Sequence, residues 1–145
     1  MKQDFTTTIM VDQTPDEVYE TILDVRSWWS GLYAETFTGS SEKIGDEFTF
    51  QAGGGAHHTK QRLTELEAGR KVVWLVTEAN LSFTDKKDEW VGTKISFEIY
   101  PEAGRTRIVF THLGLIPSFE CYDSCAPAWT QYVQERLVAA LSATN

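Results

Sequence analysis

The chain has 145 residues and a formal net charge of -8 at pH 7, with a hydrophobic share of 41% and an aromatic share of 12%. This length fits one domain, residues 1–145, and the apolar content excludes a disordered chain. The negative charge argues against binding to nucleic acid or to an anionic membrane surface, because both would repel it. No apolar stretch fits a signal peptide or a membrane span, which predicts a cytoplasmic protein.

The first elements are a strand and a short helix. Residues 5–11 alternate in a period of two and are rich in β-branched side chains, which predicts a strand with one inward face. Thr14, Pro15 and Glu17 then have the spacing of a helix start, with Thr14 as N-cap and Glu17 closing a capping box. We expect this helix to end near Asp24.

A second short helix is expected to carry Trp28 and Trp29 and to stop at Ser30 and Gly31. Adjacent side chains on a helix do not share one face. We therefore expect one indole in the core and the other at an edge or mouth of the domain.

The rest of the chain, up to the last helix, has the pattern of antiparallel strands separated by turns. The continuous apolar run at residues 72–76 is typical of a central strand, whereas residues 81–89 end in charges and predict an exposed loop. Three glycines at 53–55 predict a chain reversal with a mobile tip. The predicted strands are residues 33–38, 47–51, 57–66, 72–76, 93–100 and 105–113.

Residues 124–143 are predicted to form a long amphipathic helix, with Asp123 or Ser124 as N-cap and Pro127 in the first turn. A sheet with its helices on one side is an α+β architecture, and six to seven twisted strands would curl around this helix. The apolar stripe of the helix consists of Trp129, Val133, Leu137, Ala140 and Leu141.

This order of elements resembles the helix-grip fold of the START-like (SRPBCC) superfamily. In detail the chain is similar to the family of activator of heat-shock ATPase homologues (AHSA1-like), and the resemblance covers nearly the whole length. The stretches that carry it are TPDEVY at 14–19, Trp28 and Trp29, LEAGRKVVW at 66–74, TRIVFTHLG at 106–114, and Trp129.

The resemblance implies a deep cavity between the long helix and the concave face of the sheet. Relatives use this cavity for lipids, hormones, polyketides or aromatic molecules, so it does not name the ligand. The family takes its name from a eukaryotic cochaperone, which links it to the stress response. A single domain lacks the other domain of that protein, and chaperone activation is not inherited from the name.

The leading functional hypothesis is therefore the binding of a hydrophobic or aromatic small molecule under the terminal helix. The alternative for each side chain is that it simply packs against its neighbours. The residues expected to line the ligand site are Trp28, Phe48, Phe50, His57, Trp74, Phe97, Phe110, His112, Trp129 and Val133.

Histidines supply the polar candidates. His112 shares the inward parity of its strand and could orient a ligand or act as a general base, although a satisfied core histidine is commoner. His57 and His58 lie on opposite faces of their strand, so at most one points inward. Thr59 and Gln61 share the parity of His57 and could add polar contacts.

Other chemistry finds little support. The only cysteines, Cys121 and Cys125, are too few for a metal site without recruited histidines, so neither a metal nor a disulfide is expected. No nucleophile elbow, phosphate loop or dinucleotide fingerprint occurs, so we assign no cofactor and no catalytic residue. Two alternatives stay open: a cyclase- or hydrolase-like enzyme that uses His112, and a module that contacts a chaperone. Either a monomer or a homodimer fits the sequence.

Overall fold

The protein is described by a computed structural model, which defines residues 4–30, 34–55, 57–82, 87–116 and 122–143. Helix α3 runs through a π-helical segment, η2, into α4, and η1 is a single 3₁₀ turn. The strands are β1 (Phe5–Val11), β2 (Thr36–Gly39), β3 (Glu47–Ala52), β4 (His57–Glu67), β5 (Lys71–Leu81), β6 (Lys94–Glu102) and β7 (Arg105–Leu113). The helical segments are α1 (Pro15–Leu23), α2 (Val25–Trp28), η1 (Gly53–Gly55), α3 (Tyr122–Gln131), η2 (Tyr132–Leu137) and α4 (Val138–Ala143).

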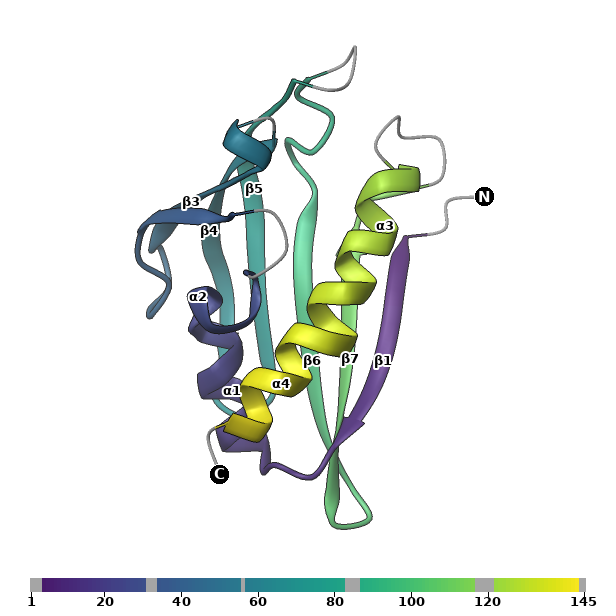
Figure 1. Ribbon diagram of the computed structural model, residues 1–145. Helices are drawn as coiled ribbons and strands as arrows, with labels where there is room; N and C mark the ends of the chain where they lie inside the picture. Colours follow the sequence, from purple (N-terminus) through teal and green to yellow (C-terminus); the bar gives the residue numbers. More distant parts are fainter. Residues whose placement is uncertain (1–3, 31–33, 56, 83–86, 117–121, 144–145) are drawn as a thin grey trace.

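The strands described here form one antiparallel sheet in the order β1-β7-β6-β5-β4-β3-β2. Figure 1 shows the α3–η2–α4 helix lying diagonally across one face of this sheet, with α1 and α2 on the same side. This arrangement confirms the α+β helix-grip prediction. None of the helices in the described ranges has the length and apolar character needed to cross a membrane.

Helix α1 begins as its sequence predicts. The Thr14 hydroxyl accepts a hydrogen bond from the Glu17 backbone N–H at 3.2 Å, and the Glu17 carboxylate accepts one from the Thr14 N–H at 2.9 Å. This capping box satisfies two backbone donors at the helix start. The helix ends before Asp24, whose N–H donates back to the carbonyls of Glu20 and Thr21.

The fourth of the seven strands in the sheet is β5, so the prediction of a central strand is confirmed. Val72, Trp74 and Val76 are fully buried on its inner face, and Val73 on the outer face is 1% exposed. Burial on both faces explains the continuous apolar run.

The C-terminal helix differs from its prediction at its start. It begins at Tyr122, so Asp123 and Ser124 lie inside the helix and not at its N-cap, and Pro127 lies in the helix interior. Because this proline is near the helix start, it removes only the backbone hydrogen bond to the carbonyl of residue 123. The predicted end at Ala143 is confirmed.

The predicted apolar stripe of this helix is buried even though η2 interrupts the 3.6-residue period. Segments of π-helix inside α-helices are rare and frequently mark functional sites. The stripe residues at 2% exposure or less are Trp129, Val133, Leu137 and Leu141, while Ala140 is half-buried.

Strand β2 begins later than predicted and extends through Gly39, where a turn was expected. Gly39 pairs with Phe48 and has φ +93°, and a Cβ atom there would lie 2.3 Å from the Glu47 carbonyl oxygen. Only glycine fits such a close approach. Gly39, which the sequence placed in a turn, is therefore needed within the strand itself. The predicted stop of the second helix at Gly31 and the predicted strand start at residue 33 lie outside the described ranges.

Candidate functional site

The interior between the sheet and its helices contains the ten side chains predicted to line a ligand site. Nine of them are at most 2% exposed, and His57 is partly buried. They come from α2, from β3 to β7 and from the C-terminal helix. The inner positions of the strands were therefore predicted correctly from alternation alone.

Aromatic rings in this interior contact one another directly. Trp29 stacks on Phe50 with ring centroids 4.3 Å apart and lies 5.0 Å from Trp129. Trp129 is 4.7 Å from Phe110, which in turn contacts Phe97 at 5.0 Å. These contacts occupy much of the space between helix and sheet, so a ligand that enters it must displace a ring.

The prediction that one of two adjacent tryptophans lies at an edge is wrong. Trp28 and Trp29 are 0% and 1% exposed, and their rings stack at 5.7 Å. Helix α2 ends at Trp28, and Trp29 follows it with ψ 52°, outside the helical conformation. Because Trp29 has left the helical wheel, both side chains turn toward the sheet.

Trp90 is a site residue that the sequence did not reveal. It follows the charged stretch that was predicted as an exposed loop, and Lys87 and Asp88 in that stretch are indeed exposed. The Trp90 side chain itself is 2% exposed. Its ring lies edge-on to His57 at 4.6 Å and to His112 at 4.5 Å, and it is nearly parallel to Trp129 at 6.0 Å.

A chain of hydrogen bonds runs through His112, which is fully buried. The Trp129 indole N–H donates to His112 Nδ1 at 3.0 Å, and His112 Nε2 lies 2.8 Å from the Thr93 hydroxyl. The Thr93 hydroxyl donates to the Trp90 carbonyl at 2.6 Å. Thr93 therefore has its proton committed and accepts from His112 at Nε2.

These partners determine the protonation state of His112. An indole N–H is a donor only, so Nδ1 must be unprotonated, and the ring is the neutral tautomer with its proton on Nε2. Burial lowers the pKa of His112 to about 3, with a smaller effect from the nearby His57. Both ring nitrogens are occupied, so His112 has the structure of a satisfied core histidine and does not offer a general base.

His57 lies on the same inner face, at the start of β4. Its ring contacts Phe50 edge-on at 5.4 Å as well as Trp90. Burial lowers the pKa of His57 to about 4, and the neighbouring His58 adds to this effect. His57 is therefore neutral at physiological pH and presents an aromatic edge to the interior.

A second polar pair lies further along β4. Thr59 and Gln61 are both 0% exposed, and the Gln61 side-chain amide donates to the Thr59 hydroxyl. They face inward because their cross-strand partners on β3 are Phe50 and Phe48, which are buried. Their shared parity with His57 predicted this position.

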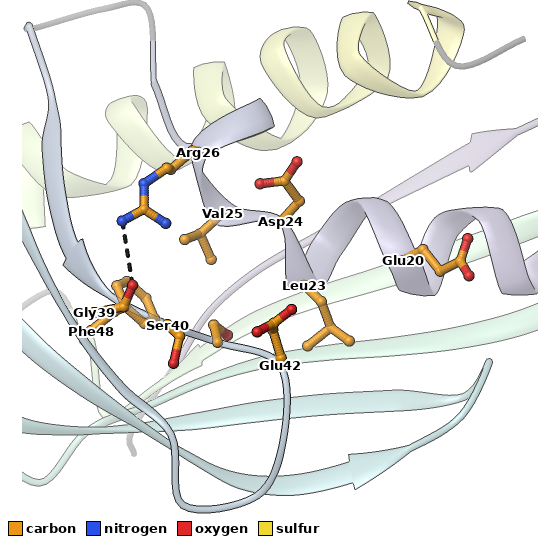
Figure 2. Close-up of a pocket in the computed structure, with 10 residues that line it drawn as sticks. Glu20, Leu23, Asp24, Val25, Arg26, Gly39, Ser40, Glu42 and Phe48 are labelled. Atoms are coloured by element: carbon orange, nitrogen blue, oxygen red, sulfur yellow. Dashed lines mark hydrogen bonds between the residues drawn. The ribbon is translucent and has the colours of Figure 1, made fainter.

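A separate groove of about 600 Å³ lies between α1–α2 and the β2–β3 connection. Figure 2 shows these two elements facing each other, with the Arg26 guanidinium donating to the Gly39 carbonyl at 3.4 Å. Of the predicted site residues only Phe48 lines it. The groove residues are Glu20, Leu23, Asp24, Val25, Arg26, Gly39, Ser40, Ser41, Glu42 and Phe48.

The charged side chains of this groove, Glu20, Asp24, Arg26 and Glu42, are all exposed. Solvent screens such charges, so they do not form a strongly polarised site. Ser41 is buried at the floor, where its hydroxyl accepts a hydrogen bond from the Trp74 indole at 2.8 Å. The groove therefore contacts the core through the hydrogen bond between Ser41 and Trp74. Its charged side chains are solvated like those of an ordinary surface.

Neither cysteine was expected to bind a metal. Cys125 is buried at α3, and Cys121 lies outside the described ranges. Within the described ranges, no three His, Cys, Asp or Glu side chains are grouped to hold a metal ion.

Solved structures with the same fold come from several organisms. The Aha1 dimer from Colwellia psychrerythraea is 20% identical, with a TM-score of 0.75 and 96% of each chain covered. CalU16 from Micromonospora echinospora is 15% identical, with a TM-score of 0.62 and coverage of 94% of this chain and 74% of that one. DynU16, from the dynemicin biosynthetic locus, is 13% identical with a TM-score of 0.67, covering 98% of this chain and 48% of that one.

Identities this low show the shared fold alone. No protein of curated function matches the sequence. The family model for the Activator of Hsp90 ATPase homolog 1-like protein matches residues 12–142, which is most of the chain. The match extends from just before α1 to the end of the C-terminal helix. The chain therefore belongs to the Activator of Hsp90 ATPase homolog 1-like family.

Proposed function

We propose that this protein binds a planar aromatic or apolar small molecule between the C-terminal helix and the sheet, in the place that the Trp90 ring fills. The observation that carries this proposal is the position of Trp90. Its ring enters the interior from a turn whose neighbours Val91 and Gly92 are exposed, while its contacts His57, His112 and Trp129 belong to regular elements.

A side chain on a surface turn can leave a core when the turn alone moves, whereas one on a central strand leaves only when the sheet opens. If Trp90 swings outward, it vacates a slot of indole size. The imidazole rings of His57 and His112, both nearly perpendicular to the Trp90 ring, then bound the slot together with the nearly parallel Trp129 indole. Such walls suit a flat aromatic ring.

The family and its neighbours support a small-molecule role at a coarser level. DynU16 is described as a putative protein in the dynemicin biosynthetic locus. Catalysis by His112 has less support, because both of its ring nitrogens already have partners. A cytoplasmic location, a role in the stress response and a chaperone contact stay predictions from the sequence and the family name.

The oligomeric state is also a prediction. The neighbour from Colwellia psychrerythraea is described as a dimer. Light scattering after gel filtration distinguishes a monomer of 16.4 kDa from a homodimer.

The test is calorimetric titration with a panel of one- to three-ring aromatic compounds. We expect saturable binding to the wild type and tighter binding to Trp90→Ala, because the ligand no longer displaces the indole. Val91→Ala is the control, since it changes the exposed neighbour of Trp90 in the same turn and should not tighten binding. Absence of binding to both the wild type and Trp90→Ala would contradict the proposal, as would equal gains in the two variants.

A further inference from the structure

The Gln61 side chain carries a buried carbonyl whose hydrogen bonding is incomplete. Its Nε2 donates to the Thr59 hydroxyl, whereas no donor in the described ranges lies within hydrogen-bonding distance of Oε1. The residue is 0% exposed. Native proteins contain few such groups, because an unsatisfied buried acceptor loses the hydrogen bond it would make to water.

The contrast with the other buried polar cluster is informative. Around His112 every donor has an acceptor: the Trp129 indole donates to the imidazole, the imidazole to Thr93, and Thr93 to the Trp90 carbonyl. That cluster is complete without a ligand. The Gln61 and Thr59 pair is equally buried, yet Gln61 Oε1 has no partner in the described ranges, so it can make a polar contact to a bound molecule.

The pair lies on the inner face of β4 that also carries His57, two residues before Thr59, and the His57 ring contacts the Trp90 ring at 4.6 Å. Gln61 pairs across β4–β5 with Val76, close to an irregularity in the register. The Val76 carbonyl accepts from the Gly92 N–H at 2.9 Å, and the Val76 N–H donates to the Thr93 carbonyl at 2.9 Å. The turn that carries Trp90 is thus hydrogen-bonded to the strand beside Gln61, one strand away from its side chain.

We infer that Gln61 is the specificity-determining polar contact of this site, and that the ligand is an aromatic molecule with a neutral hydrogen-bond donor, a phenolic hydroxyl or a ring N–H, which donates to Gln61 Oε1. This inference rests on the proposed function. A neutral donor suits Gln61 Oε1 because the amide carries no charge that could balance a buried cation.

Calorimetry with two matched probes tests the inference. 2-Naphthol carries the donor, and 2-methoxynaphthalene has the same ring system without it. We expect the wild type to bind 2-naphthol about tenfold more tightly, the effect of one buried hydrogen bond. In Gln61→Met the preference for 2-naphthol over 2-methoxynaphthalene should disappear, while the affinity for 2-methoxynaphthalene is retained. Gln51→Met, the same change on the outer face of β3, should keep the preference.

The outcomes separate the two proposals. If neither probe binds the wild type and the wider aromatic panel also fails, the proposed function is wrong. If both probes bind equally, or if Gln61→Met keeps the preference, ligand binding stands but the role of Gln61 is overturned. Tighter binding of 2-acetylnaphthalene, which offers only an acceptor, would show the opposite orientation of the Gln61 amide and would also overturn it.

A second measurement covers the case in which Gln61→Met does not fold. In wild-type protein with ¹⁵N-labelled glutamine, 2-naphthol should shift the Gln61 side-chain amide resonances and 2-methoxynaphthalene should leave them in place. A crystal structure with 2-naphthol bound and an ordered water on Gln61 Oε1 would refute the inference.

Discussion

Lowering the pH from 7 to 5 should destabilise this protein through His57 and His112. Burial lowers the pKa of His57 to about 4 and that of His112 to about 3, from an ordinary value of 6.5. In the folded state both rings are therefore neutral at pH 5, whereas in the unfolded chain both are protonated. Unfolding takes up protons, so stability is fully present above pH 6.5 and falls as the pH drops toward the folded-state values.

The size of the effect follows from linkage. Protonating an unfolded imidazole at pH 5 stabilises the unfolded state by about 2 kcal/mol relative to pH 7. Two such residues give about 4 kcal/mol, a large part of the roughly 5–15 kcal/mol that holds a typical domain together. Carboxylates titrate mainly below pH 5, so this window isolates the two histidines.

The assay is urea denaturation at pH 7 and pH 5, followed by tryptophan fluorescence. We expect His57→Gln and His112→Gln each to remove about half of the pH dependence of the free energy of unfolding. A wild-type loss below about 1 kcal/mol would refute the reasoning. So would two single variants that both keep the full pH dependence, because the burial of the rings would then not control their protonation.

Three further changes test the packing by urea denaturation at pH 7. Trp129→Phe keeps an aromatic ring but removes the donor to His112 Nδ1, and should cost about 1–3 kcal/mol; an unchanged midpoint would contradict the hydrogen bond. Trp29→Ala should cost about 3–5 kcal/mol, as for a core residue, whereas a loss under about 1 kcal/mol would place the side chain at a mouth. Thr59→Val combined with Gln61→Met removes the incompletely bonded pair and should raise the free energy of unfolding by about 1 kcal/mol, and a lower value would show that the pair is satisfied.

Features with a local cause were predictable from the sequence. Strand and turn patterns located all seven strands of the sheet. Alternation predicted the inward faces of Phe48, Phe110 and His112, because a strand presents every second residue to one side. The capping box located the start of α1, because its hydrogen bonds join residues three apart. The family resemblance added the order of the elements in space.

Features that depend on distant contacts were not predictable. Trp29 is buried because the chain leaves the helical conformation at that residue, and Trp90 is buried because a surface turn folds back onto α3. No periodicity marks either position. Both ring nitrogens of His112 have hydrogen-bond partners only because a turn and a helix bring Thr93 and Trp129 to it, from 19 and 17 positions away.

The pairing of β1 with β7 has a consequence for the order in which the chain folds. Phe5 pairs with His112 and Val11 with Thr106, and the Thr6 hydroxyl bonds a carbonyl 104 positions away. During synthesis the first strand to leave the ribosome is thus among the last to find its partner. Closing so long a loop delays folding to the slower range of small domains, and until then neither edge of β1 has a strand partner, so chaperones or other nascent chains can reach both.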